Sequence, residues 1–168
     1  MNRLPTHRTL KLICLGLVLS LASGLAQAQN MLMARTAMSF ETTMSSVEKA
    51  LHEHGYTVAH IQKCDGGLTG MGYETDNYKV IFFGKPEEVR RMTGEYPEMI
   101  PFFPQKVVVY AEGDNTVVST LNPVEFTEFF PQPELYIQFQ RWKNDYESIL
   151  EDIRALDHAA SRQAKTSG

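Results

Sequence analysis

QKVVVYAEGDNTVVSTL, residues 105–121, contains two runs rich in β-branched side chains, at 106–111 and 116–121. The segment between them, Glu112-Gly113-Asp114-Asn115, is short and polar and contains a glycine. Two such runs joined by a few turn-forming residues are typical of a β-hairpin. The stretch therefore predicts two antiparallel strands, and the rest of the fold must supply a sheet to which they belong.

The segments around the hairpin alternate between helical and extended patterns. Met44, Val47 and Leu51 recur at helical spacing, and Gly55 stands where a residue just past a helix C-terminus is expected. Proline fits the first turn of a helix, so Pro86 is expected to begin one. The predicted order is an arm or first strand (29–39), a helix (43–54), a strand (56–61), a glycine-rich loop (64–72), a strand (78–83), a short helix (86–92), a proline-marked loop (97–104), the hairpin and a helical turn (124–130).

The C-terminal segment has the most regular pattern in the chain. Apolar residues step by four and three in turn, which predicts one long helix with a continuous stripe. The stripe consists of Leu135, Phe139, Trp142, Tyr146, Ile149, Ile153 and Leu156. It either packs on the protein's own sheet, which its aromatic members favour, or mediates dimerisation through this helix. Residues 158–168 are expected to form a frayed tail.

These elements predict an α+β fold with two layers. We expect a mostly antiparallel sheet of about four to five strands with helices on one face, plus a long C-terminal helix. The chain is divided into a signal peptide (1–28), an α+β domain (29–130) and the long C-terminal helix with its tail (131–168).

The N-terminus has the pattern of a secretory signal peptide. Basic residues precede an apolar run at 12–25, and Ala26-Gln27-Ala28 follows as a cleavage site. The apolar run is too short to cross a bilayer, which takes about 20 residues. We therefore expect a mature protein that begins at Gln29, is periplasmic or secreted, and has no transmembrane segment after cleavage.

Charge restricts the partners that this chain can bind. It has 16 Lys and Arg against 20 Asp and Glu, a formal charge of −4. Loss of Arg3, Arg8 and Lys11 with the signal would bring the mature charge to about −7. Nucleic acid is not an expected partner, since phosphate binding requires a basic face. No cofactor is predicted.

Cleavage would also remove Cys14 and leave Cys64 as a lone thiol. In an oxidising compartment such a thiol is buried, bound, reactive or paired with another molecule. One hypothesis is a metal or haem site formed by Cys64, His60 and, across the glycine-rich loop, Met71. Thiolate, imidazole and thioether groups together suit Cu(I) or Zn(II).

A second hypothesis for Cys64 is redox or sulfur chemistry. Lys63 would stabilise the thiolate, and the backbone amides near Gly66 and Gly67 could hold an anion. The sequence has no C-x-x-C pair, which excludes a thioredoxin-type dithiol cycle. The plain structural interpretation is a partly buried thiol at the end of a strand.

A cluster of aromatic residues lies beside prolines in the second half of the chain. These side chains are expected in the core, or else they line a pocket for an apolar ligand. The cluster comprises Phe102, Phe103, Phe126, Phe129 and Phe130.

Three pieces of the sequence resemble a bacterial family catalogued as domain of unknown function 302. They are VEKAL (47–51) running into GYTV (55–58), IFFGKP (81–86), and PQKVVVY (104–110) leading to the Asn122-Pro123 corner. The resemblance covers residues 36–130 and implies a small two-layer α+β domain that forms dimers. It implies no agreed activity.

The chain departs from the pattern of that family at two places. Family members carry a histidine just after the GYTV strand, at the place of Cys64 here, and the helix after Phe130 is an extension beyond the usual domain. The sequence favours an exported homodimer that binds an unknown small ligand or periplasmic protein, with no recognised catalytic constellation. Two alternatives stay open: a redox or sulfur-handling protein that uses Cys64, and a metal or haem binder that uses Cys64 and His60.

Overall fold

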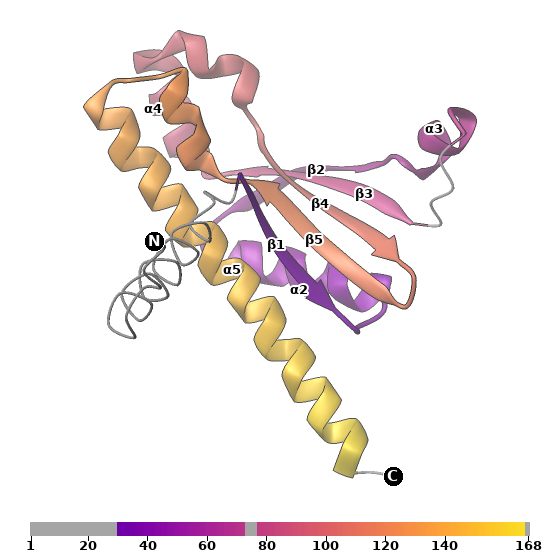
Figure 1. Ribbon diagram of the computed structural model, residues 1–168. Coiled ribbons are helices and arrows are strands. Elements are labelled where there is room, and N and C mark those ends of the chain that lie inside the picture. The colour runs from indigo at the N-terminus through magenta and orange to yellow at the C-terminus, as the bar shows by residue number, and fades with distance from the viewer. Residues whose placement is uncertain (1–29, 73–76, 167–168) are drawn as a thin grey trace, which may run out of the picture.

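The computed structural model describes residues 30–72 and 77–166 (Figure 1). The expected signal peptide, residues 1–28, lies outside the described residues. No helix in the described ranges combines the length and the hydrophobicity that a membrane span requires.

Five strands form one antiparallel sheet in the described part of the chain (Figure 1). Their spatial order is β1-β5-β4-β3-β2, so β1 and β2 are the edges. The predicted hairpin is β4–β5, which Glu112 and Asn115 close as the last pair, and Gly113 adopts a positive φ of 58° in the turn. The strands are β1 Met31–Thr36, β2 Thr57–Lys63, β3 Tyr78–Gly84, β4 Gln105–Glu112 and β5 Asn115–Leu121.

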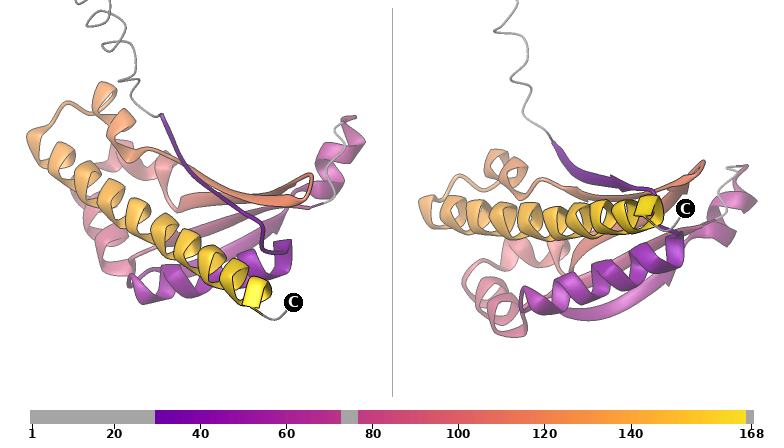
Figure 2. Two further views of the ribbon diagram at one scale, coloured as in Figure 1. Left: turned by 60° about the horizontal axis from the view of Figure 1, so that its bottom comes forward. Right: turned by 90° about the horizontal axis from the view of Figure 1, so that it is seen from below.

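Helices α2 and α5 lie side by side on one face of this sheet (Figure 2). Helix α4 lies beyond one end of the sheet, and α3 projects at the other end, beyond the β2–β3 pair (Figure 1). The predicted α+β fold, with helices on one face and a long C-terminal helix, is therefore confirmed. The helices are α2 Phe40–Glu53, α3 Asp65–Gly70, α4 Pro86–Glu95 and α5 Pro133–Thr166, with 3-10 turns η2 Pro97–Phe102 and η3 Pro123–Glu128.

The apolar stripe of α5 forms the centre of the core. Every predicted member of the stripe is buried except Leu156, which is 42% exposed. The buried stripe belongs to one core with the inward-facing residues of the strands, which are Leu32, Ala34, Ile81, Phe83, Val107, Val109 and Val118. The stripe is thus covered by the protein's own sheet and is not available to a partner helix.

Capping residues set the ends of α2 and α4. Helix α2 begins earlier than expected because the hydroxyl of Ser39 accepts a hydrogen bond from the Thr42 N–H at 3.2 Å. Pro86 begins α4 as predicted. The helix runs past its predicted end at residue 92 as far as Glu95, and it ends before Pro97, whose ring disfavours helical geometry in the residue before it.

Three other segments also differ from the expectation. The glycine-rich segment contains a short helix, α3. Each glycine in a helix costs only about 1 kcal/mol relative to alanine, so glycines do not exclude a helix there. The region expected to be a proline-marked loop contains the 3-10 turn η2. The expected frayed tail is helical as far as Thr166.

Replacing Ile153 with alanine tests whether α5 is part of the core. Ile153 is fully buried, so we expect the free energy of unfolding to fall by about 2–5 kcal/mol. Ile137→Ala is the matched control, because Ile137 lies on the same helix and is 69% exposed; its effect should stay within about 0.5 kcal/mol. Urea unfolding measures both, and equal effects would contradict this packing.

Candidate functional site

Cys64 lies directly after β2, at the end that leads into α3. Its backbone N–H donates to the carbonyl of Tyr78 at 3.0 Å and so prolongs the pairing of β2 with β3. The thiol is half-buried, and its Sγ lies 3.9 Å from the carbonyl oxygen of Gln62. These contacts are those of a partly buried thiol at a strand end.

The other predicted ligands do not gather around this thiol. Because β2 stays extended through Lys63, His60 and Cys64 are separated by about 13 Å along the strand. The His60 ring stacks on Phe82 with centroids 6.2 Å apart, and Met71 is 70% exposed beyond α3. Within residues 30–72 and 77–166, no three His, Cys, Asp or Glu side chains converge on a possible metal position.

The groups expected to stabilise a thiolate are also placed differently. Lys63 pairs with Lys79 in the sheet. Successive side chains of a strand point to opposite faces of the sheet, so the side chain of Lys63 lies on the face opposite to that of its neighbour Gln62. Gly66 and Gly67 lie within α3 rather than in an open loop. The structure therefore does not assemble the anion-holding loop that the sequence suggested.

The sheet face opposite α2 and α5 is apolar and no described helix covers it (Figure 2). We call it the outer face. In β3 and β4 the residues between the core positions are apolar as well, whereas a strand exposed on one face normally alternates with polar residues. The apolar members of the outer face are Met31, Met33, Tyr78, Val80, Phe82, Val108, Tyr110, Val117 and Leu121.

Strand register brings these side chains together across the sheet. Val80 pairs with Val108, and Tyr78 pairs with Tyr110, which in turn pairs with Val117. Glu112, at the end of β4, is ion-paired with Arg35 of β1.

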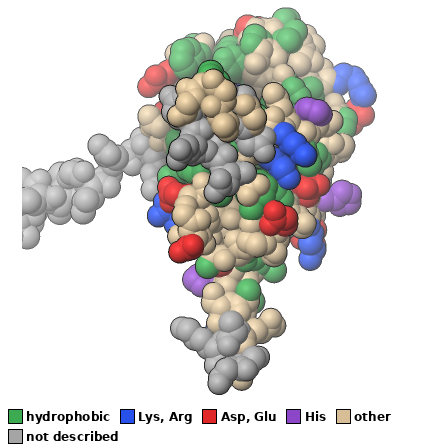
Figure 3. Space-filling view, turned by 90° about the vertical axis from the view of Figure 1, so that its right-hand side faces the viewer, with side chains coloured by type: hydrophobic (Ala, Val, Ile, Leu, Met, Phe, Trp, Pro, Cys, Tyr) green, Lys and Arg blue, Asp and Glu red, His purple; other side chains and the backbone are tan. Residues whose placement is uncertain are grey.

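By contrast, the surface around α3 carries interspersed acidic and basic side chains over its described part (Figure 3).

An aromatic cavity of about 310 Å³ lies at one end of the sheet, between η2, η3 and the ends of β3, β4 and β5. Of the predicted aromatic cluster, Phe102, Phe103 and Phe126 line this cavity. Phe130 is buried in the core, and Phe129 is 71% exposed. The alternative of an apolar pocket therefore applies to three of the five residues.

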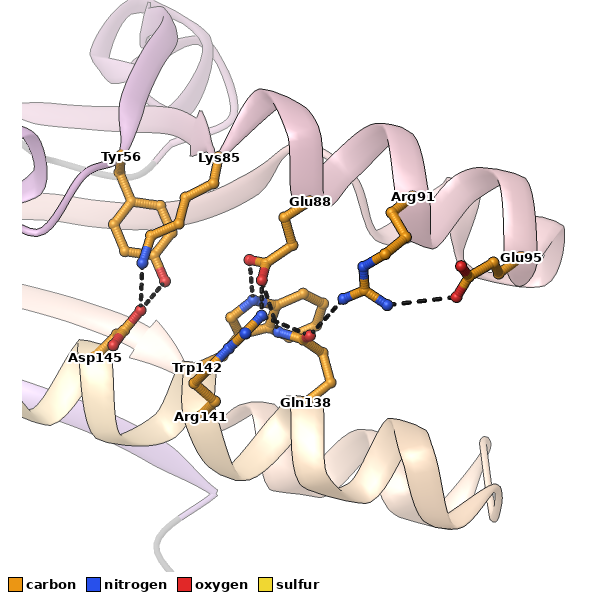
Figure 4. A network of polar contacts seen from close by, with 9 residues as sticks. All are labelled: Tyr56, Lys85, Glu88, Arg91, Glu95, Gln138, Arg141, Trp142 and Asp145. Atoms are coloured by element: carbon orange, nitrogen blue, oxygen red, sulfur yellow. Dashed lines mark hydrogen bonds and ion pairs between the residues drawn. The ribbon is translucent and has the colours of Figure 1, made fainter.

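A polar cluster joins α5 to the end of β3 (Figure 4). The Tyr56 hydroxyl donates to a carboxylate oxygen of Asp145 at 2.7 Å, and the Lys85 ammonium lies 2.9 Å from the same oxygen. The Lys85 Nζ also lies 4.4 Å from the centroid of the Tyr56 ring, a cation–π contact. All three side chains are thereby fixed by one another.

A second polar cluster joins α4 to α5, one to two turns away (Figure 4). Glu88, whose side chain is 12% exposed, accepts hydrogen bonds from the Trp142 indole at 2.7 Å and from the Gln138 amide at 3.1 Å. Arg141 forms an ion pair with the same carboxylate. Removing Glu88 would leave the buried indole N–H without this acceptor, so the cluster fixes the position of α4 on α5.

Comparison with known proteins identifies the family. The sequence profile described as "Domain of unknown function DUF302" matches residues 33–153. The chain belongs to the DUF302 family. The matched range includes α5 as far as Ile153, whereas the resemblance seen in the sequence ended at residue 130. No curated protein matches the chain.

The fold is also that of a solved DUF302 structure. The crystal structure of an uncharacterized conserved DUF302 protein from Bacillus stearothermophilus superposes with a TM-score of 0.68 at 19% sequence identity. The similarity covers 75% of this chain and 99% of the other. At this identity the likeness concerns the fold alone.

The Gly84-Lys85-Pro86 motif of this DUF302 domain has a physical explanation. A Cβ added to Gly84 would lie 2.9 Å from Cγ2 of Val89, so the close approach of β3 to α4 requires glycine. Lys85 bonds Asp145 of α5, and Pro86 begins α4. The sequence revealed the motif but not the partner of Lys85, because that partner lies far along the chain.

Burial raises the pKa of Tyr56, Tyr78 and Tyr146, and most strongly that of Tyr56 and Tyr146. Burial and then the hydrogen bond to Asp145 raise the pKa of Tyr56 far above its usual value. Tyr146 is 5% exposed, and its burial raises its pKa well above the usual value, with further contributions from Tyr56 and Asp145. Both groups therefore remain neutral phenols over the physiological range.

These shifts predict a loss of stability in alkali. In the unfolded chain each tyrosine loses its proton near pH 10, whereas the folded domain retains it. The stabilisation is fully present below the unfolded pKa, and above it stability falls by about 1.4 kcal/mol per pH unit for each tyrosine.

Tyr146→Phe and Tyr56→Phe should each make this decline less steep, as measured by urea unfolding between pH 8 and 11. Tyr56→Phe should also reduce stability at pH 7 by about 1–3 kcal/mol, because it removes the hydrogen bond to Asp145. An unchanged slope in both variants would show that neither phenol is held neutral by the fold.

Proposed function

We propose that this DUF302 protein is an exported homodimer that acts by binding rather than by catalysis, and that its two copies meet through the outer face. The observation that carries the proposal is the apolar sheet face formed by β1, β5, β4 and β3, which no described helix covers. On it Met31, Met33 and Leu121 are 43%, 52% and 40% exposed, whereas Val80 and Val117 are already buried. Large exposed apolar patches in proteins are typically interaction sites. The core stripe of α5 is already buried and cannot serve this purpose.

The size of the outer face supports a second copy as its occupant. Four strands spaced by about 4.8 Å, with rises of about 3.3 Å per residue, give a projected area of roughly 450 Å². Because side chains protrude from the sheet, the solvent-accessible area of this face is larger than its projected area. It approaches the roughly 800 Å² that each partner buries in a standard interface. Two sheets can pack face to face at about 10 Å.

The charge of the outer face also supports self-association. The protein has an excess of acidic residues, yet Glu112 is the one acidic side chain that the strands contribute to this face in the described ranges, and Arg35 neutralises it. The remaining charge that the strands place on this face is Lys106, which pairs with Phe82 near its end. Two copies can therefore meet there with little electrostatic repulsion. A two-fold symmetric dimer uses the same surface patch on both subunits, and the outer face can serve as that patch on each copy.

Val108→Asp should convert the dimer to a monomer. The substitution places an unpaired carboxylate at the centre of the interface, twice in each dimer, and should weaken association at least about 100-fold. Sedimentation velocity measures the mass, and circular dichroism verifies folding. Met33→Asp, at a 52% exposed position on the edge strand, provides a second variant with less risk to folding.

Ile137→Asp is the matched control, because Ile137 is 69% exposed on α5, away from the outer face. It should leave the dimer intact. A wild-type monomer at all concentrations, or a dimer that survives both Val108→Asp and Met33→Asp, would remove the basis of this proposal.

Export is supported by the leader pattern that ends at Ala26-Gln27-Ala28. When the full chain is expressed in a bacterium, we expect the protein in the periplasmic fraction with Gln29 as its first residue, as N-terminal sequencing determines. Ala28→Leu should retain the leader, because the cleavage site requires a small residue. Recovery of the uncleaved wild-type chain from the cytoplasm would contradict export.

A further inference from the structure

The aromatic cavity beside η2 and η3 lies on the side of the sheet that faces α5. Its wall includes Tyr146 of α5 and Thr120, which pairs across the strands with the core residue Leu32. Gln105 is also in the wall, and it faces the same side as the buried Val107 because side chains alternate along β4. The Thr120 hydroxyl already donates to a carbonyl of β4 at 2.9 Å. The space is thus bounded by the end of the sheet, by α5 and by the two 3-10 turns.

Phenylalanine rings and prolines form most of the apolar wall of this cavity. The rings of Phe102 and Phe126 meet edge to face with centroids 4.8 Å apart, and Phe103 adds a third ring. On its other side, Phe126 contacts Phe139 of α5 with centroids 5.7 Å apart, which fixes this wall to the core. Aromatic rings favour edge-to-face and offset contacts, so a further ring placed in the cavity can extend the same array. The prolines of the wall are Pro101, Pro104 and Pro123.

No cationic side chain faces this space from the described residues. Lys106 is the one charged residue in the wall, and it pairs with Phe82 across β3 and β4. Its side chain therefore projects on the outer face, opposite α5 and Tyr146. Lys85 is held by Asp145 at 2.9 Å and is not part of the wall. A carboxylate bound beside Tyr146 would thus have no ammonium to neutralise it.

The charge nearest to the α5 side of the cavity is negative. Burial, Tyr56 and Asp145 together raise the pKa of Tyr146 well above its usual value, so the charge of Asp145 is felt at the Tyr146 ring. This charge disfavours an anion in the cavity. A buried cation would also lack a partner, because no Asp or Glu lines the wall among the described residues and Asp145 already holds Lys85 and Tyr56. The cavity therefore favours a ligand without charge.

We propose that this cavity binds a small uncharged aromatic molecule, with its ring against Phe102, Phe103 and Phe126. The volume sets the size of the ligand. An apolar cavity of about 150 Å³ accepts benzene, so about 310 Å³ accommodates one ring with a short alkyl substituent. The cavity belongs to a single chain, so the proposal does not depend on the homodimer.

Ethylbenzene is the probe, phenylacetate is its anionic counterpart of similar size, and ethylcyclohexane is its saturated counterpart. Trp142 is the single tryptophan of the chain, and its ring lies 5.8 Å from that of Phe103, so ligand binding can be followed by its fluorescence. We expect saturable binding of ethylbenzene. Phenylacetate should bind at least about tenfold more weakly because its charge has no partner in the cavity, and ethylcyclohexane about threefold more weakly because it lacks the ring contacts. Titration calorimetry measures the affinities independently of the fluorescence.

Two variants test the cavity itself, each with a matched control. Phe102→Ala removes a wall ring that is 37% exposed and should weaken ethylbenzene binding about tenfold. Phe129→Ala, at a 71% exposed ring outside the wall, should leave the affinity unchanged. Gln105→Phe places a ring in the space that the ligand needs and should weaken binding at least about tenfold, whereas Gln62→Phe, at an exposed position of β2 outside the wall, should have no effect. Circular dichroism verifies that all four variants are folded.

The inference fails if ethylbenzene does not bind saturably, if phenylacetate binds as tightly, or if Phe102→Ala and Gln105→Phe both behave as the wild type does. Equal affinity for ethylcyclohexane would contradict the preference for an aromatic ring. Repeating the titration on the Val108→Asp variant separates this result from the homodimer. Binding that persists in the monomer supports the cavity alone, and binding lost together with the dimer would contradict a site contained in one chain.

Discussion

The burial of the α5 stripe against a single face of the sheet is the contact on which the rest of the structure depends. Leu135, Phe139 and Ile153 are fully buried in it, and Trp142 is 1% exposed. Helix α5 thereby covers much of one face of the sheet, and α2 covers a further part of the same face. A sheet covered in this way on one side leaves its second side to solvent or to another molecule.

Polar clusters fix the register of this helix where apolar packing alone would allow it to slide. Asp145 holds Tyr56 and Lys85, and Glu88 holds Trp142 together with its neighbours. Each cluster contains a carboxylate whose hydrogen bonds would be lost if α5 moved by one turn, and buried polar groups without partners are costly. The glycine-lysine-proline motif therefore serves the docking of α5 and α4, which explains its place in the family pattern without requiring catalysis.

The two candidate sites lie away from the cysteine that first attracted attention. Cys64 is half-buried at a strand end, and the residues expected to join it lie apart because β2 continues straight past His60. The outer face offers area and little charge, which suits a protein surface. The aromatic cavity is lined mainly by phenylalanine rings and prolines, which suits an apolar ligand. The two features thus fit different occupants.

The sequence by itself determined the hairpin, the long amphipathic helix and the α+β class, because turn chemistry and side-chain periodicity act over a few neighbouring residues. It also contained, in VIFF (80–83) and VVVY (107–110), the apolar runs that mark a sheet with two apolar faces. Only the tertiary structure decided which partners meet. The pairing of Lys85 with Asp145, the ring contact of Phe102 with Phe126, and the separation of His60 from Cys64 depend on contacts between distant segments, which no local pattern encodes.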